Sequence, residues 1–241
     1  MGYVLITGSS KGIGLEIAKE LSIKGHKIII TGKSENSLQS SKKNFNNTSN
    51  HKFIQIDFEN DEELEKFFQE VETYEIDSII HNLGGKIKND THPIDLEVLN
   101  KSINLNFLVS LKINNRLVDK LKENPSKIIY IGSTASLHAK ASPCYVLAKS
   151  LISSYIKNIS SVYLEKNILI CGIMPGIVAH KGSEWDNKRT EDKNRYVQMK
   201  NSQPLKRFLM PNDITEHVVS LVNMQSLAFT GSMIKLDAND Y

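Results

Sequence analysis

Tyr145 and Lys149 form the pair of side chains in this sequence best suited to acid–base chemistry. A free tyrosine has a pKa near ~10, too high for a base at neutral pH, and a nearby ammonium group lowers that pKa by favouring the phenolate. The two residues lie four positions apart in a segment with helical spacing, so their side chains share one helix face. The pair could therefore exchange a proton with a carbonyl or alcohol oxygen.

The Tyr-x-x-x-Lys spacing occurs twice, and its context separates the two occurrences. Tyr196 and Lys200 lie in a charged stretch, with no serine at a strand end twelve residues earlier. Ser133 ends an apolar run twelve residues before Tyr145, where its hydroxyl could hold a substrate oxygen and steady the tyrosine. Each residue alone has an ordinary structural interpretation, such as a turn-capping serine or a surface lysine. Their order favours a catalytic set of Ser133, Tyr145 and Lys149.

A glycine-rich turn at residues 7–14 reads Thr-Gly-Ser-Ser-Lys-Gly-Ile-Gly and joins the first expected strand to the first expected helix. Gly8 would permit a tight turn, Gly12 would let the backbone approach a pyrophosphate, and Gly14 would let helix and strand pack closely. The helix N-terminus would supply amide donors to the phosphates. The alternative is a glycine-rich turn without a ligand. Residues between the glycines complete the candidate cofactor set of this turn: Ser10, Lys11 and Ile13.

The glycine spacing and the Ser–Tyr–Lys order together resemble the single-domain short-chain dehydrogenases/reductases. The resemblance covers nearly the whole chain and is weakest at residues 180–202. It implies that Asp57 lies near the adenine amino group, and that Asn104 helps to hold a water connected to the catalytic lysine. Further cofactor positions implied by the resemblance are Asn82, Gly84, Pro175, Gly176 and Val178.

Several positions depart from the family pattern. His81 and Leu83 stand in a segment where the family has Asn-Asn-Ala-Gly, and Ala238 and Asn239 stand where it commonly ends in Asp-Gly-Gly. His180 replaces a threonine or serine that contacts the nicotinamide carboxamide. It could donate to that carboxamide, reach the substrate, or be a solvent-facing residue.

The residues after the second strand favour NADP(H) over NAD(H). An acidic side chain there would bind the ribose hydroxyls of NAD, whereas a basic one accommodates a 2′-phosphate. The sequence is Thr-Gly-Lys-Ser, without a carboxylate. Lys33, helped by Lys11, could neutralise the phosphate, and Ser34 could hydrogen-bond to it. The alternative is that Lys33 is an ordinary solvated lysine.

Alternating strands and helices must position these residues. Short apolar runs indicate buried strands at 3–6, 27–31, 53–56, 78–80, 127–131, 169–173 and 233–236, and helical spacing predicts helices at 13–23, 62–71, 96–121, 143–164 and 214–222. This alternation predicts an α/β fold with a doubly wound, Rossmann-like parallel sheet, as one domain over residues 1–241. The stretch 34–50 is expected to end in a surface loop, and 180–210 to form a substrate lid of loop or short helices.

The composition of the chain indicates which classes of binding partner to expect. The net charge is +3 with scattered basic residues, and no apolar run approaches the roughly 18 residues of a membrane helix, so neither nucleic acid nor membrane is expected. Two cysteines without metal-type spacing predict a cytoplasmic protein and no metal site. By resemblance, the long helices around Asn104 and Tyr145 would pair into a homodimer or homotetramer.

The resulting hypothesis is an NADP(H)-dependent oxidoreductase of a small carbonyl or alcohol substrate. A β-ketoacyl thioester, a sugar-derived ketone and another small carbonyl compound all remain open as substrates. The competing classes are a catalytically silent dinucleotide-binding regulator and a subunit of a larger assembly. An intact Ser133, Tyr145 and Lys149 argue against a regulator, because a pure sensor needs only the cofactor site.

Overall fold

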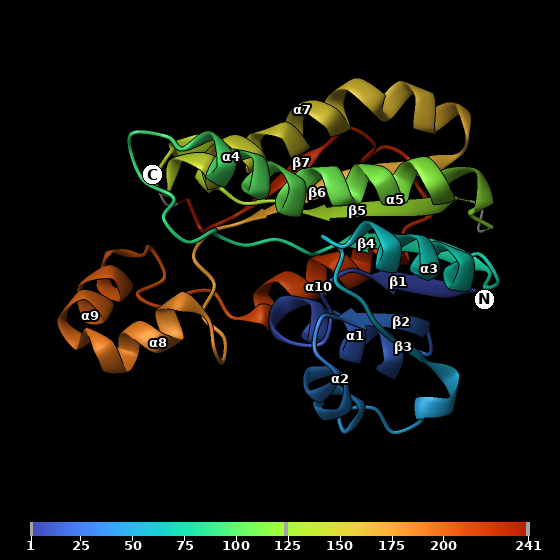
Figure 1. Cartoon of the computed structure of the whole chain (residues 1–241), viewed down its shortest axis with the longest axis horizontal. Coiled ribbons are helices and arrows are strands. Elements are labelled where there is room, and N and C mark those ends of the chain that lie inside the picture. Colours follow the sequence, from blue (N-terminus) through green and yellow to red (C-terminus); the bar gives the residue numbers. More distant parts are fainter. Residues whose placement is uncertain (1, 123–124, 240–241) are drawn as a thin grey trace.

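A seven-stranded parallel sheet lies between two layers of helices in the computed structural model, which describes residues 2–122 and 125–239 (Figure 1). The strands are β1 Tyr3–Ile6, β2 Lys27–Gly32, β3 Lys52–Gln55, β4 Ile76–His81, β5 Ser126–Ile131, β6 Ile168–Pro175 and β7 Met233–Leu236. Their order across the sheet is β3-β2-β1-β4-β5-β6-β7. The predicted doubly wound, single-domain α/β fold is confirmed, with a strand at each of the seven expected places.

The helices cover both faces of the sheet. They are α1 Gly12–Ile23, α2 Glu35–Lys42, α3 Asp61–Val71, α4 Leu96–Ile103, α5 Val109–Leu117, α6 Ala135–His138, α7 Pro143–Glu165, α8 Glu184–Glu191, α9 Lys193–Ser202 and α10 Pro211–Val222. One core cluster joins the sheet to α1 and α10 through residues such as Ile17 and Val218. The other joins it to α3, α5 and α7 through residues such as Phe67, Ile113 and Ile152. Burial on both faces explains why the strands are continuous apolar runs.

Two segments contain more structure than the expected elements describe. The stretch 34–50 begins with α2, which is anchored by the buried side chain of Leu38 and is too polar elsewhere to show apolar periodicity. The helix expected at 96–121 is divided into α4, a π-helical turn at Asn104–Leu108, α5 and a 3₁₀ turn at Val118–Lys120. In 3₁₀ and π segments, the backbone hydrogen bonds span three and five residues instead of the four of an α-helix. The spacing of apolar residues alone does not reveal such segments.

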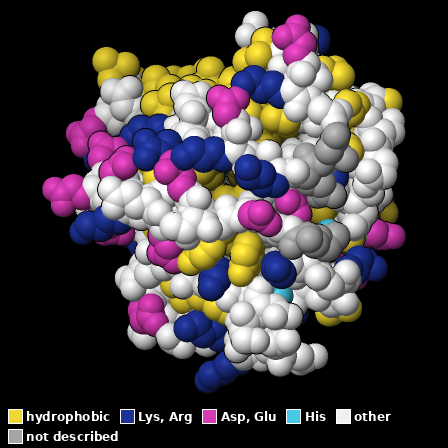
Figure 2. Space-filling view, turned by 90° about the vertical axis from the view of Figure 1, so that its right-hand side faces the viewer, with side chains coloured by type: hydrophobic (Ala, Val, Ile, Leu, Met, Phe, Trp, Pro, Cys, Tyr) yellow, Lys and Arg dark blue, Asp and Glu magenta, His cyan; other side chains and the backbone are white. Residues whose placement is uncertain are grey.

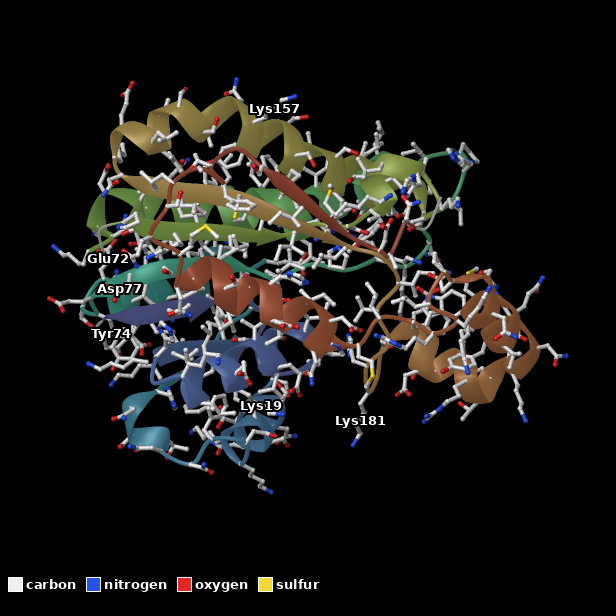
Figure 3. The ribbon with its side chains drawn as sticks, turned by 180° about the vertical axis from the view of Figure 1, so that it is seen from behind. Lys19, Glu72, Tyr74, Asp77, Lys157 and Lys181 are labelled. Atoms are coloured by element: carbon white, nitrogen blue, oxygen red, sulfur yellow. The ribbon has the colours of Figure 1, made fainter. Side chains whose placement is uncertain are left out.

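Residues 180–210 extend away from the sheet as α8, α9 and their connections (Figures 1 and 3). Lys181 points away from the body (Figure 3). The rings of Trp185 and Tyr196 pack on Phe208, with centroids at 5.0 and 5.3 Å. Tyr196, from the second Tyr-x-x-x-Lys spacing, thus packs within this segment.

The strands are parallel, so the carboxyl ends of β1, β4, β5 and β6 lie along one edge of the sheet, and the strand order reverses between β1 and β4. Ligands of doubly wound proteins bind outside that edge. Within the described residues, no helix is both long and apolar enough to cross a membrane.

Candidate active site

A cleft of about 930 Å³ opens at this edge, between the strand ends and the segment that carries α8 and α9. Nine residues predicted from the sequence line it: Ile13, Asn82, Gly84, Ser133, Tyr145, Lys149, Pro175, Gly176 and Val178. Asn104, Lys33, Ser34 and Asp57 do not line it, and neither do the other residues expected from the glycine turn. The cleft therefore gathers the residues expected around the reacting atoms.

Ser133, Tyr145 and Lys149 lie together on one wall of the cleft. The Ser133 hydroxyl lies near enough to the Tyr145 hydroxyl to lower the pKa of that phenol, and the Lys149 Nζ lies 5.8 Å from the centre of the Tyr145 ring. Lys149 donates to the carbonyl of Ile131 at 3.0 Å, which fixes the ammonium beneath the end of β5. Helix α7 begins with Pro143, whose fixed φ suits the first helical position, and it presents Tyr145 and Lys149 on one face.

Burial sets the proton affinity of both groups. It raises the pKa of Tyr145, and the nearby Ser133 hydroxyl offsets part of that rise. Burial lowers the pKa of Lys149 to about 8. At neutral pH the tyrosine therefore carries a proton that it can donate, and the lysine beside it is mostly charged.

Asn106, rather than Asn104, meets the lysine end of the site. The Asn106 side chain bonds both the amide and the carbonyl of Gly85, each at 2.9 Å. A Cβ placed on Gly84 would lie 2.6 Å from Asn106 Oδ1 and 3.0 Å from Lys149 Nζ, so Gly84 separates these two groups. Asn104 lies at the start of the π-helical turn, two positions before Asn106. The geometry favours Asn106 for the role that the resemblance gave to Asn104.

Residues that follow β4 hold the glycine turn that follows β1, across the point where the strand order reverses. The Thr7 hydroxyl accepts the amides of Asn82 and Leu83, each at 3.0 Å. The Asn82 side-chain amide donates to the carbonyls of Thr7 and Gly8 at 3.1 and 2.9 Å. A Cβ on Gly14 would lie 2.5 Å from the Asn82 amide nitrogen, so a larger residue would displace this contact. Asn82 thus shapes the turn as well as lining the cleft.

Lys33 and Asp57 form an ion pair beyond the glycine turn. The Lys33 Nζ lies 2.6 Å from Asp57 Oδ2, and the Lys33 side chain is 70% exposed. The hydrogen bond to Asp57 raises the pKa of Lys33. For Asp57, burial acts to raise the pKa, but hydrogen bonds from Lys33 and the Glu59 amide lower it overall. Lys33 is charged and held near the place expected for a 2′-phosphate.

Ser10 and Ser34 are connected through α2. The Ser37 hydroxyl lies 3.0 Å from that of Ser10, and 2.7 Å from the Ser34 carbonyl oxygen that accepts its hydrogen bond. Ser34 precedes the first residue of α2 and is exposed beside its N-terminus. Ser34 therefore lies next to Lys33 in the chain and directly before the N-terminus of α2.

His180 lies against the glycine turn. A Cβ placed on Gly12, whose φ is +61°, would lie 2.9 Å from His180 Cε1. The His180 amide donates to the Ser183 hydroxyl at 3.1 Å, which holds the start of α8. An ion pair of 2.8 Å between Lys86 and Glu184 joins α8 to the loop after β4. The predicted lid therefore touches both the glycine turn and the loop after β4.

Asp90 supports the helix that carries Tyr145 and Lys149, and the sequence gave no indication of this role. Its carboxylate accepts the amides of Cys144 and Tyr145 at 2.8 and 2.9 Å. Burial acts to raise the pKa of Asp90, but the hydrogen bonds from these two amides help to lower it overall. The carboxylate and the helix are more than fifty residues apart in the chain, so local spacing could not connect them.

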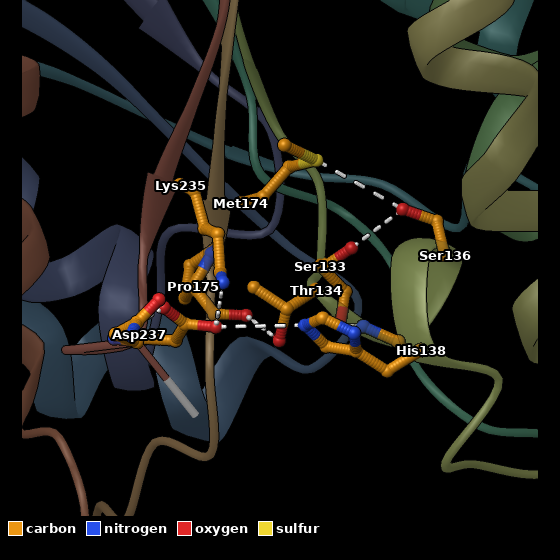
Figure 4. A network of polar contacts seen from close by, with 10 residues as sticks. Ser133, Thr134, Ser136, His138, Met174, Pro175, Lys235 and Asp237 are labelled. Atoms are coloured by element: carbon orange, nitrogen blue, oxygen red, sulfur yellow. Dashed lines mark hydrogen bonds and ion pairs between the residues drawn. The ribbon is translucent and has the colours of Figure 1, made fainter. Parts of the chain in front are cut away.

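The loop after Ser133 is tied to the end of the chain (Figure 4). His138 Nε2 lies 3.7 Å from Asp237 Oδ2, and Lys235 Nζ lies 3.3 Å from the same oxygen. Ala238 and Asn239, which stand where the family has glycines, take φ values of +53° and +68°. These two residues therefore adopt the left-handed backbone conformation that glycine most easily adopts.

Comparison with known proteins places this fold and site in one family. Residues 2–193 match the short chain dehydrogenase family model. The chain is 25% identical to a 3-oxoacyl-(acyl-carrier-protein) reductase FabG of Aquifex aeolicus, over 97% of this chain and 94% of the relative. It is 25% identical to a very-long-chain 3-oxoacyl-CoA reductase of Mus musculus, over 74% of this chain and 60% of that longer protein.

A solved structure agrees with these matches. A short chain dehydrogenase family protein from Francisella tularensis superposes with a TM-score of 0.84 and 25% identity, covering 99% of this chain and 98% of that one. Fold and site define a nicotinamide-dependent oxidoreductase of the doubly wound class. The chain belongs to the short-chain dehydrogenase family.

Proposed function

We propose that this protein is an NADP(H)-dependent ketoreductase of a small carbonyl substrate in which Tyr145 is the acid and base. One observation carries the proposal: Ser133, Tyr145 and Lys149 converge on the wall of a single cleft at the strand ends. The similar FabG and 3-oxoacyl-CoA reductases favour a 3-oxoacyl substrate, and a sugar-derived ketone is the second candidate.

The residues present fit a dinucleotide. The positive φ of Gly8 and Gly12 turns the backbone into the N-terminus of α1, where amides can bind a pyrophosphate. Pro175 and Gly176 would contact the nicotinamide, and the Lys33 ammonium and the Ser34 hydroxyl would bind the 2′-phosphate. When bound, the nicotinamide supplies the hydride.

The chain's own groups handle the proton. The Ser133 hydroxyl and the Tyr145 phenol would both hydrogen-bond the substrate oxygen, and Tyr145 would donate its proton to that oxygen during reduction. Lys149 would stabilise the resulting phenolate and hold the cofactor ribose. The reverse oxidation would use the same groups, with the phenolate accepting the proton.

The test compares binding with turnover. Purified protein would be titrated with NADPH and NADH, followed by cofactor fluorescence, and assayed with a panel of ketones beside Tyr145→Phe. The proposal expects dinucleotide binding in both proteins and turnover only in wild type. Dinucleotide binding without turnover of any ketone would favour a silent regulator, and failure to bind either dinucleotide would favour an assembly subunit.

Assembly and location are part of the same proposal. We propose a homodimer or homotetramer that forms through α7, because the exposed faces of this helix and of the adjoining π-helical turn carry Leu147, Leu151 and Leu108. A cytoplasmic location is supported by Cys144 and Cys171, which are both buried as free thiols.

A further inference from the structure

The cleft holds more positive than negative charge. Among the described residues that line it, the cations are Lys86, Lys140, Lys149 and Arg195, whereas the carboxylate is that of Glu184. Lys86 pairs with Glu184 at 2.8 Å, and Lys149 donates to a backbone carbonyl. Lys140 and Arg195 form no ion pair within the described parts of the chain. These two charges are available to a ligand.

The acidic residues around Arg195 have other partners. Asp186 pairs with Arg189 at 3.4 Å, and Glu191 pairs with Lys188 at 3.6 Å. Asp192 accepts the backbone amide of Arg195 at 3.0 Å, as the N-cap of α9, so this contact leaves the guanidinium unpaired. The charge of Arg195 therefore faces the cleft without a carboxylate bound to it.

Both free cations lie at the substrate end of the cleft. Lys140 belongs to the loop between Ser133 and Tyr145, and Arg195 belongs to α9 in the lid. Neither lies on the glycine turn, where the cofactor phosphates are expected. Trp185 and Met199, which also line the cleft from α8 and α9, add apolar surface beside Arg195.

We propose that the substrate is a carbonyl compound whose apolar chain ends in an anionic group, a carboxylate or a phosphate. Arg195 and Lys140 bind the anion, since guanidinium groups match these planar or tetrahedral oxyanions. Trp185 and Met199 contact the chain, while Ser133 and Tyr145 hold the carbonyl. This inference rests on the proposed function and adds the substrate class to it.

The test uses Trp185, the single tryptophan of the chain, as a binding probe. Its fluorescence would be followed in the presence of NADP⁺ during titration with levulinate, longer oxo acids and their methyl esters. Dihydroxyacetone phosphate beside dihydroxyacetone would separate phosphate from carboxylate. We expect the anion to bind about ten- to a hundredfold more tightly than its neutral counterpart in at least one pair.

Matched variants locate the effect. Arg195→Ala removes most of the preference for the anion and Lys140→Ala reduces it, whereas Arg189→Ala, in the same lid but paired with Asp186, leaves it unchanged. Equal affinity for anion and neutral counterpart in every pair, including no binding of either, overturns the inference. So does a preference that survives in both Arg195→Ala and Lys140→Ala.

Turnover separates this inference from the proposed function. Reduction of acid and ester with equal kcat/KM would overturn the anionic substrate and leave the ketoreductase standing. Anion-selective binding that depends on Arg195, without reduction of any ketone, would overturn the ketoreductase and leave an anion-binding cleft.

Discussion

The side chain of Lys149 is buried, and the proposed mechanism needs its positive charge. Its pKa of about 8 means that the ammonium loses its proton just above neutral pH. We expect kcat/KM for ketone reduction to fall as the pH rises through about 8, because the phenolate of Tyr145 then loses its neighbouring cation. A pH profile of initial rates measures this.

Lys149→Arg provides the comparison for this profile. Arginine stays charged throughout the range, so the fall should move to higher pH even if overall activity is lower. A variant whose activity declines at the same pH as wild type would assign the decline to another group.

The ion pair of Lys33 with Asp57 leads to a prediction about the relative affinities for NADPH and NADH. Lys33→Ala should weaken NADPH binding about tenfold or more and leave NADH binding unchanged, because only NADPH carries the 2′-phosphate. Asp57→Asn should raise the ratio of NADPH to NADH affinity, since it releases Lys33 from its partner. Fluorescence titrations measure both ratios, with Lys112→Ala as a surface control. Equal weakening of both cofactors by Lys33→Ala would remove the basis for NADP(H) preference.

At the scale of elements, Asp90 joins the loop after β4 to the first turn of α7. Asp90→Ala leaves the amides of Cys144 and Tyr145 without their acceptor, which should lower the free energy of unfolding by about 1–3 kcal/mol. It should also lower kcat, because Tyr145 is in that turn. Asp95→Ala, which removes the carboxylate capping α4, is the matched control and should leave kcat unchanged.

The pH dependence of this stabilisation has a defined sign. The pKa of Asp90 is lower in the folded protein than its ordinary value, so its contribution is present at neutral pH and is lost as the pH falls through the folded pKa. Urea unfolding should therefore show a difference between wild type and Asp90→Ala that shrinks in acid. A constant difference would mean that the carboxylate charge is not involved.

The elements also show what could be predicted from the sequence. Strands buried on both faces have a strong apolar signal, so all seven and their parallel sheet were predictable. Helix α2 has one buried apolar anchor, Leu38, and gave little periodicity. The π-helical turn changes the local register of the helix, and no spacing rule could choose between Asn104 and Asn106. Long-range contacts such as Asp90 with α7 depend on the folded loop.

Among the described residues, exposed apolar side chains recur along α7, and charged groups of both signs are intermixed on the surface. On the face drawn in Figure 2, basic and acidic groups are intermixed, and hydrophobic side chains gather along the top, the side on which α7 lies in Figure 1. Surface ion pairs such as Lys112 with Asp61 and Arg116 with Glu72 join groups of opposite charge. On α7, Leu147 and Leu151 are 45% and 36% exposed. An uncovered apolar helix face favours association with a second copy.

Leu147→Asp tests this association. A charge on the helix face should reduce the molar mass measured by light scattering, because a buried unpaired carboxylate destabilises the interface. Leu205→Asp, at an exposed leucine after α9, should leave the mass unchanged. A wild-type mass equal to that of one chain would remove the proposed oligomer.

The contact between His180 and Gly12 has a kinetic consequence. A dinucleotide lying on Gly12 would meet the imidazole ring of His180, which precedes α8, so we expect its arrival to rearrange the entrance used by the second reactant. Binding should then follow a compulsory order, with the dinucleotide first and the carbonyl compound second. Product-inhibition patterns would reveal that order, and His180→Ala should make the order random.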